Sequence, residues 1–136
     1  MIEYTFYKYK EHSLTYSSGE LNDLPEDIVS TLKEWQVSYA DKVVIATLNQ
    51  SIIGFFRYDL GFKRPWLYAA GTYVIPEYRN QNIAFNLWEK AIANESPNKI
   101  LAHVASDGGL KLVSKIRRCY PKIIMDISLD KKMLVA

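Results

Sequence analysis

The chain of 136 residues is long enough for one domain with a buried core, and 49% of its residues are hydrophobic. Its 17 lysines and arginines exceed its 15 aspartates and glutamates by too little to indicate a nucleic-acid or acidic-membrane partner on charge alone. No apolar run approaches the roughly 18–20 residues of a membrane span, and no signal-peptide block is present. The single Cys119 excludes an internal disulfide. We therefore expect a cytoplasmic protein without membrane contact, in which Cys119 is a buried, inert thiol.

The first half of the chain predicts a strand, a helix and a β-hairpin. Residues 2–9 alternate between apolar and polar side chains, which is typical of a strand with one polar face. A capping residue followed by proline and an acid at residues 23–26 signals the start of a helix, which is expected over residues 25–39. Residues 42–48 and 52–58 are rich in strand-forming side chains and are joined by a tight turn, so they predict a hairpin.

The central stretch predicts a strand, a polar turn and a helix in direct succession. Residues 67–75 are rich in β-branched and aromatic side chains, and Pro76 ends this strand because proline cannot donate to a central ladder. After the polar loop of residues 78–82, apolar side chains return with helical spacing from Ile83 to Ile92. The N–H groups of the first helical turn lack intrahelical partners, and the helix dipole adds positive potential. The turn is therefore a natural site for an anion or a phosphate.

The last part of the chain predicts two strands separated by a helix. Residues 99–105 form a short apolar strand, and residues 106–109 form a turn that can cap a helix over residues 110–118. Residues 122–129 alternate and predict a final strand. The central strand–helix–strand unit requires parallel pairing, whereas the hairpins require antiparallel neighbours, so the sheet is mixed. The order β, α, β, β, β, α, β, α, β predicts a single α/β or α+β domain over residues 1–136.

The central turn resembles a known family motif. Its residues, VIPEYRNQNIA from Val74 to Ala84, resemble the acetyl-CoA loop of the GCN5-related N-acetyltransferases, the GNAT superfamily. The family carries Arg or Gln, two variable residues, a glycine, one variable residue, then glycine or alanine. Arg79 and Ala84 fit this pattern, and Asn82 stands at the glycine position. Asparagine adopts the left-handed backbone conformation more readily than most residues, so we expect the turn to form, with the Asn82 side chain crowding the phosphate.

The resemblance covers essentially the whole chain and implies a fold and a cofactor. The implied fold is a mixed, mostly antiparallel central sheet with helices on both faces, in which the central strand and the next one splay apart. Acetyl-CoA, as co-substrate, would place its pantetheine arm in this opening and its pyrophosphate at the helix N-terminus. Asp107 would either contact the pantetheine or only cap its helix, and no metal site is expected. The implied cofactor contacts are the backbone of Val74 and Ile75 and the loop residues Arg79, Asn80, Gln81, Asn82, Ile83 and Ala84.

The resemblance leaves the catalytic groups open. Acetyl transfer to an amine needs a base for the amine proton and an acid for the leaving thiolate. Many GNAT members use a tyrosine as the acid, and the matching position here is Val113. Tyr120 lies further on and could serve if the chain curls back; otherwise it is a core or rim tyrosine. Tyr73, on the central strand, is the second candidate. His103 is either a base or a hydrogen-bonded structural histidine.

Three hypotheses for function follow. The first is an acyl-CoA-dependent N-acyltransferase that moves an acetyl group from acetyl-CoA directly to a primary amine, on a small molecule or a protein, within a ternary complex. The second is a GNAT-fold protein without catalysis that serves as a binding or assembly module, which Asn82 and Val113 favour. The third is a nucleic-acid-directed protein that uses the basic residues between 111 and 122, although these also fit a solvated helix face. The final strand would suit a homodimer.

Overall fold

Within the part of the chain that the structure describes, six strands form one sheet, and their spatial order is their order in the sequence. In the computed structural model the described residues are 1–8 and 40–133. The helix expected over residues 25–39 lies outside them. The elements are β1 (Glu3–Lys8), β2 (Lys42–Leu48), β3 (Ser51–Leu60), β4 (Trp66–Val74), η2 (Pro76–Tyr78), α2 (Ile83–Glu95), β5 (Lys99–Val104), α3 (Asp107–Cys119), β6 (Ile124–Leu129) and η3 (Lys131–Met133).

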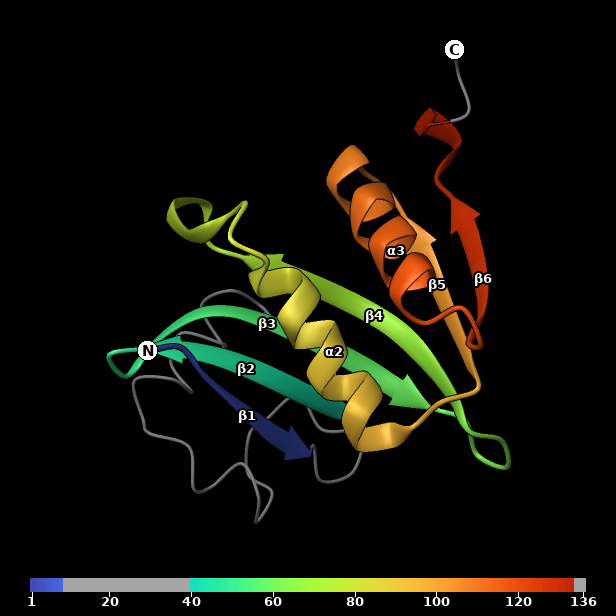
Figure 1. Ribbon diagram of the computed structural model, residues 1–136, viewed down its shortest axis with the longest axis horizontal. Coiled ribbons are helices and arrows are strands. Elements are labelled where there is room, and N and C mark those ends of the chain that lie inside the picture. The colour runs from blue at the N-terminus through green and yellow to red at the C-terminus, as the bar shows by residue number, and fades with distance from the viewer. Residues whose placement is uncertain (9–39, 134–136) are drawn as a thin grey trace.

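The sheet is mixed, as the sequence predicts. Strands β1 to β4 pair antiparallel in succession, whereas β4 with β5 and β5 with β6 pair parallel. The β2–β3 turn consists of Asn49 and Gln50, whose φ angles of 50° and 68° match the twist of a hairpin. Helices α2 and α3, the two long helices of the described residues, lie on the same face of the sheet (Figure 1).

The core of the described region lies between this sheet and the two helices. The apolar stripe of α2 includes Leu87 and Trp88, both buried, and the Trp88 ring stacks on Phe56 of β3 with centroids 4.6 Å apart. From α3, Val113 and Ile116 join the same cluster. Tyr120, directly after α3, is half-buried against the same cluster, whereas the neighbouring Cys119 side chain is exposed to solvent. The expectation that Cys119 is buried is therefore wrong.

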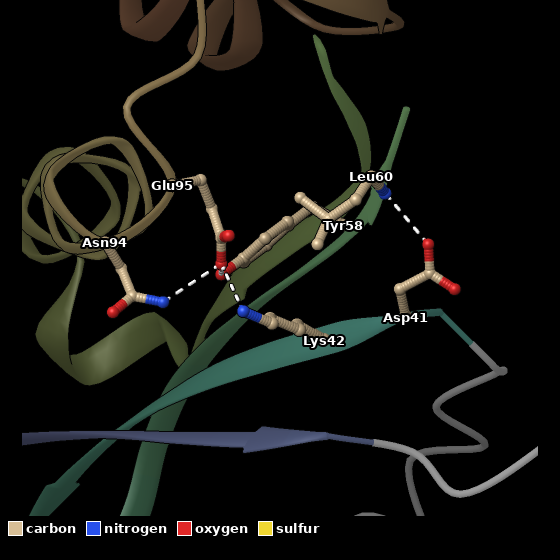
Figure 2. A network of polar contacts seen from close by, with 6 residues as sticks. All are labelled: Asp41, Lys42, Tyr58, Leu60, Asn94 and Glu95. Atoms are coloured by element: carbon tan, nitrogen blue, oxygen red, sulfur yellow. Dashed lines mark hydrogen bonds and ion pairs between the residues drawn. The ribbon is translucent and has the colours of Figure 1, made fainter. Parts of the chain in front are cut away.

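A polar network fixes the C-terminal end of α2 to the sheet (Figure 2). The Glu95 carboxylate accepts hydrogen bonds from Lys42 Nζ (2.8 Å), the Tyr58 hydroxyl (2.7 Å) and Asn94 Nδ2 (3.0 Å). Burial alone would raise the pKa of Glu95, but the bonds from Lys42, Tyr58 and Asn94 outweigh it and lower that pKa. Burial and the neighbouring Glu95 raise the pKa of Tyr58. The network therefore favours an ionised Glu95 and a protonated Tyr58.

A second set of polar contacts lies beside this network and links the start of β2 to the end of β3. The Asp41 N–H donates to Asp59 Oδ1, and the Leu60 N–H donates to Asp41 Oδ2, both at 2.8 Å (Figure 2 shows the second). These bonds hold the start of β2 against the end of β3. Strand β3 itself extends to Leu60, two residues beyond the predicted end, because Asp59 and Leu60 pair with Tyr68 and Leu67 of β4.

Strands β4 and β5 pair at only three positions before they separate. The pairs are Trp66 with Lys99, Leu67 with Ile100 and Tyr68 with Leu101. Beyond Tyr68, β4 continues to pair with β3 alone, across a register shift. One edge of the β4 backbone is therefore left without a strand partner along the gap between β4 and β5, as the resemblance implies.

No helix among the described residues is long and apolar enough to cross a membrane.

Candidate functional site

The loop between β4 and α2 presents unpaired backbone donors. Asn80 and Asn82 have φ angles of 63° and 61°, so both adopt the left-handed conformation. The expectation that Asn82 can form this turn in place of glycine is confirmed. Its side chain makes no capping hydrogen bond to α2. The N–H groups of Ile83, Ala84 and Phe85 lie in the first helical turn, where no intrahelical acceptor is available, so they give this end of α2 positive potential.

A cleft of about 550 Å³ opens at this loop, between the end of β4 and the first turns of α3. Six of the nine residues expected to bind the cofactor line it: Val74, Arg79, Asn80, Asn82, Ile83 and Ala84. The N-terminal turn of α3 contributes Gly108 and Gly109, which expose backbone rather than side chains. The loop and the helix that the sequence singles out therefore lie at one cleft, which also takes in part of α3.

Three of the expected residues do not line the cleft. The Ile75 N–H donates to the Ile53 carbonyl of β3 (2.9 Å), and the Gln81 amide reaches the Glu77 carbonyl (3.5 Å). Asp107 is exposed as the first residue of α3. It is not the helix cap either, because Ser106 Oγ accepts from the Gly109 N–H at 3.1 Å. The interpretation of Asp107 as the helix cap is therefore wrong, because the cap is the preceding residue, Ser106.

Three cationic side chains line the cleft: Arg79, Lys111 and Lys115. Arg79 Nε donates to the Val74 carbonyl at 2.8 Å, and its guanidinium lies 5.4 Å from the centre of the Tyr73 ring. No acidic side chain is among the described residues that line the cleft. The summed charge therefore favours an anion, and phosphate suits guanidinium, ammonium and backbone N–H donors together.

The basic run of α3 divides between the cleft and solvent. Lys111 and Lys115 are one helical turn apart and line the cleft, whereas Arg117 and Arg118 do not. The solvated-face interpretation fits the exposed residues Lys111, Arg117, Arg118 and Lys122, whereas Lys115 is half-buried.

A second cavity, of about 180 Å³, adjoins the cleft and lies in the gap between β4 and β5. Its β4 wall consists of the small residues Ala69, Ala70 and Gly71, and Thr72 and Leu112 line both this cavity and the cleft. The opening therefore leads from the cationic cleft into the sheet. Val113 lines the gap as an apolar side chain, at the position where the family resemblance implies a tyrosine.

Two polar side chains line the gap, Thr72 from the face covered by α2 and His103 from the opposite face. The Thr72 hydroxyl accepts a hydrogen bond from Trp88 Nε1 at 2.8 Å. A hydroxyl that accepts in this way can still donate its own proton to a second partner. His103 Nδ1 lies 3.0 Å from Ser128 Oγ, a contact that uses one ring nitrogen and is compatible with both roles expected for His103. Strand alternation puts Val104 in the core and His103 on the opposite, exposed face. The sequence alone gives no reason to prefer Thr72 over Tyr68 and Tyr73, the other two residues of the central strand that carry a hydroxyl.

The two tyrosines predicted as catalytic lie in different places. Tyr73 lines the cleft and is 39% exposed. Tyr120 lines neither cavity, because its hydroxyl donates to Glu89 Oε2 of α2 at 2.7 Å. That hydrogen bond, with a smaller contribution from burial, raises the pKa of Tyr120 to about 12, which makes it a weaker acid. The chain does turn back after α3, but it turns towards Glu89.

Comparison with known proteins bears on this arrangement. The family model described as the acetyltransferase (GNAT) family matches residues 6–108. A search of curated proteins gave no match. Among solved structures, a GNAT-family acetyltransferase from Streptococcus pneumoniae TIGR4 is similar with a TM-score of 0.57 and 13% sequence identity, covering 88% of this chain and 92% of that chain.

Two further structures share the fold. A ribosomal-protein-alanine N-acetyltransferase from Brucella melitensis biovar Abortus 2308 has a TM-score of 0.54 at 16% identity, covering 85% of this chain and 90% of that one. AAC(6′)-Iy, in complex with the bisubstrate analogue CoA-S-monomethyl-acetylneamine, has a TM-score of 0.50 at 15% identity, covering 88% of each chain. The family match spans most of the sequence and agrees with the mixed sheet, the β4–β5 gap and the cationic cleft. The chain belongs to the GNAT acetyltransferase family.

Proposed function

We propose that this protein is an acyl-CoA-dependent N-acyltransferase that transfers an acetyl group from acetyl-CoA directly to a primary amine. The observation that carries the proposal is the cationic cleft at the start of α2, which leads into the gap between β4 and β5. Two similar structures support the same chemistry: one is a ribosomal-protein-alanine N-acetyltransferase, and the other, AAC(6′)-Iy, is bound to the bisubstrate analogue CoA-S-monomethyl-acetylneamine.

The residues present fit acetyl-CoA. Phosphates are suited to Arg79, Lys111 and Lys115 together with the first-turn N–H groups of α2. A narrow chain with amide groups is suited to the gap, because small side chains line it and one edge of the β4 backbone is free of strand pairing there. Asn82, Ile83 and Ala84 would hold the phosphates, and Val74 would lie where the cleft meets the gap.

The reaction requires a base that accepts the amine proton and a donor that stabilises the leaving thiolate, and the gap has a group for each. Acetyl-CoA supplies a thioester, whose C–S bond breaks as the amine nitrogen forms a bond to the carbonyl carbon. The Thr72 hydroxyl, fixed by the Trp88 N–H, would donate a hydrogen bond to the developing thiolate. His103 would accept the amine proton at Nε2, in the tautomer whose Nδ1–H donates to Ser128. Tyr73 would hold Arg79 in place through its ring.

The test is release of the CoA thiol from acetyl-CoA in the presence of primary amines: a polyamine, an aminoglycoside, and peptides with a free N-terminus or lysine. We expect turnover with at least one class, and Thr72→Val should lower kcat by roughly tenfold or more without an equal change in KM. Thr72→Ser, which keeps the hydroxyl, is the matched control and should retain most of the rate. Equal rates for the valine and serine variants would remove Thr72 from the mechanism.

The remaining hypotheses correspond to other outcomes of the same experiment. Acetyl-CoA binding without turnover on any amine would favour the binding module, which the apolar Val113 in the gap also fits. Binding to nucleic acid would have to use Arg117 and Arg118, since Lys111 and Lys115 line the cleft. Such binding should fall steeply with salt.

A further inference from the structure

We propose that Asn82 holds the Lys115 ammonium at the mouth of the cleft as a preformed contact for a phosphate of the acyl-CoA. The inference rests on the proposed function and assigns a specific role to each of the two residues. Lys115 would be a binding residue, and Asn82 would be a positioning residue that acts through it.

The first observation concerns the direction of the Asn82 side chain. A residue that directly precedes a helix usually caps it, as Ser106 does for α3 through the Gly109 N–H. Asn82 makes no such bond to α2, and its Oδ1 instead accepts from Lys115 Nζ of α3 at 2.9 Å. Its left-handed backbone conformation accompanies this arrangement. The first-turn N–H groups of α2 therefore stay available to a ligand, and the amide reaches across to the other helix.

The second observation is that Lys115 has two contacts that fix its position. Its ammonium lies 2.9 Å from Asn82 Oδ1 and 4.2 Å from the centre of the Phe85 ring. A lysine side chain loses substantial rotamer entropy when a ligand orders it, so holding it in place beforehand lowers that cost. An ammonium has three N–H donors, and the bond to Asn82 uses one of them. Both residues line the cleft, so the other donors are at the surface that would meet the phosphate.

The effect of replacing Asn82 with glycine should be opposite to what steric crowding alone predicts. If the Asn82 side chain only crowded the phosphate, a glycine there would relieve the crowding and tighten binding. In the arrangement described here, glycine would keep the backbone conformation but release Lys115. Asn82→Gly should therefore weaken binding, and it should do so only while Lys115 is present.

The experiment is a double-mutant cycle on the dissociation constant for CoA, measured by calorimetry at fixed salt. We expect Lys115→Met to raise Kd by about tenfold or more, as for a lost charge-assisted hydrogen bond. Asn82→Gly should raise Kd by about fivefold through lost preordering. The double variant should bind no more weakly than Lys115→Met alone. Lys115→Arg should retain much of the affinity. Arg118→Gln, which changes the net charge equally on the exposed side of α3, should change Kd little.

Three results would overturn the inference. One is unchanged or tighter CoA binding by Asn82→Gly. Another is full additivity of the two losses in the double variant, which would mean that the side chains act independently. The third is an absence of CoA binding by the unmodified protein, which would overturn the proposed function as well. Thermal melts of each variant check that it is folded, and both positions lie on the surface of the cleft, so large losses of stability are not expected.

Discussion

Replacing Trp88 with alanine should lower the free energy of unfolding by about 3–5 kcal/mol, the range for removing a buried tryptophan. The side chain is 4% exposed and stacks on Phe56 at 4.6 Å, so its removal leaves a cavity between α2 and the sheet. It also donates to Thr72, so the same change removes the group that orients this hydroxyl. Urea unfolding at neutral pH measures the loss, and the melting temperature should fall by roughly 10–20 °C.

Trp88→Phe is the matched control for this prediction. Phenylalanine preserves an aromatic ring against Phe56 but lacks the indole N–H. Its cost should be about 1–2 kcal/mol, well below that of alanine. Acetyl transfer by Trp88→Phe should nevertheless fall, because Thr72 loses its orienting donor. A loss below about 1 kcal/mol in Trp88→Ala would contradict the place given to this residue in the core.

Replacing Glu95 with leucine should cost about 2–4 kcal/mol, because it leaves Lys42 and Tyr58 without their shared partner. The side chains of Lys42 and Glu95 are only 16% and 12% exposed, so water replaces the lost contacts poorly. The exposed pair between Lys99 and Asp126 is the internal control. Its atoms are 3.8 Å apart and Asp126 is 59% exposed, so Asp126→Asn should cost less than about 1 kcal/mol. Equal costs for the two variants would contradict the structural role of the Glu95 network.

The same network gives stability a pH dependence with a definite sign. The folded protein lowers the pKa of Glu95, so the unfolded chain binds the proton more readily. The contribution of Glu95 is therefore complete above its unfolded pKa and is lost as the pH falls through the lower, folded value. Glu95→Gln cannot titrate at this position. Its free energy of unfolding should fall less steeply than that of the unmodified protein between neutral and acidic pH, and parallel profiles would rule out this contribution.

The sequence predicted the central unit well because its signals are local. Composition indicates the strand before Pro76, periodicity indicates the helix from Ile83, and the polar loop between them predicts an anion site. Most differences are at element ends, where a tertiary or capping bond decides the boundary. Strand β3 extends to Leu60 because its last residues pair with β4, and α3 begins before Leu110 because Ser106 caps it.

The candidate site was less predictable because its decisive contacts join distant parts of the chain. Asn82 and Lys115 are 33 positions apart, and nothing in the local pattern of either helix indicates that they meet. Tyr120 is paired with Glu89 on another helix, so its spacing from the expected acid position was a poor guide. Thr72 becomes a candidate only once the Trp88 N–H is seen to reach it.

The central claim, that the cationic cleft binds acetyl-CoA, is tested most directly by thermal unfolding with and without this ligand, beside Arg79→Ala. A ligand at about 100 times its Kd that binds only the folded protein adds about 2.7 kcal/mol of stability. We expect a clear rise in Tm for the unmodified protein and a smaller rise for Arg79→Ala at the same concentration. Arg118→Ala, on the exposed side of α3, should respond like the unmodified protein. An unchanged Tm at millimolar acetyl-CoA, in a protein that is folded before the ligand is added, would contradict the claim.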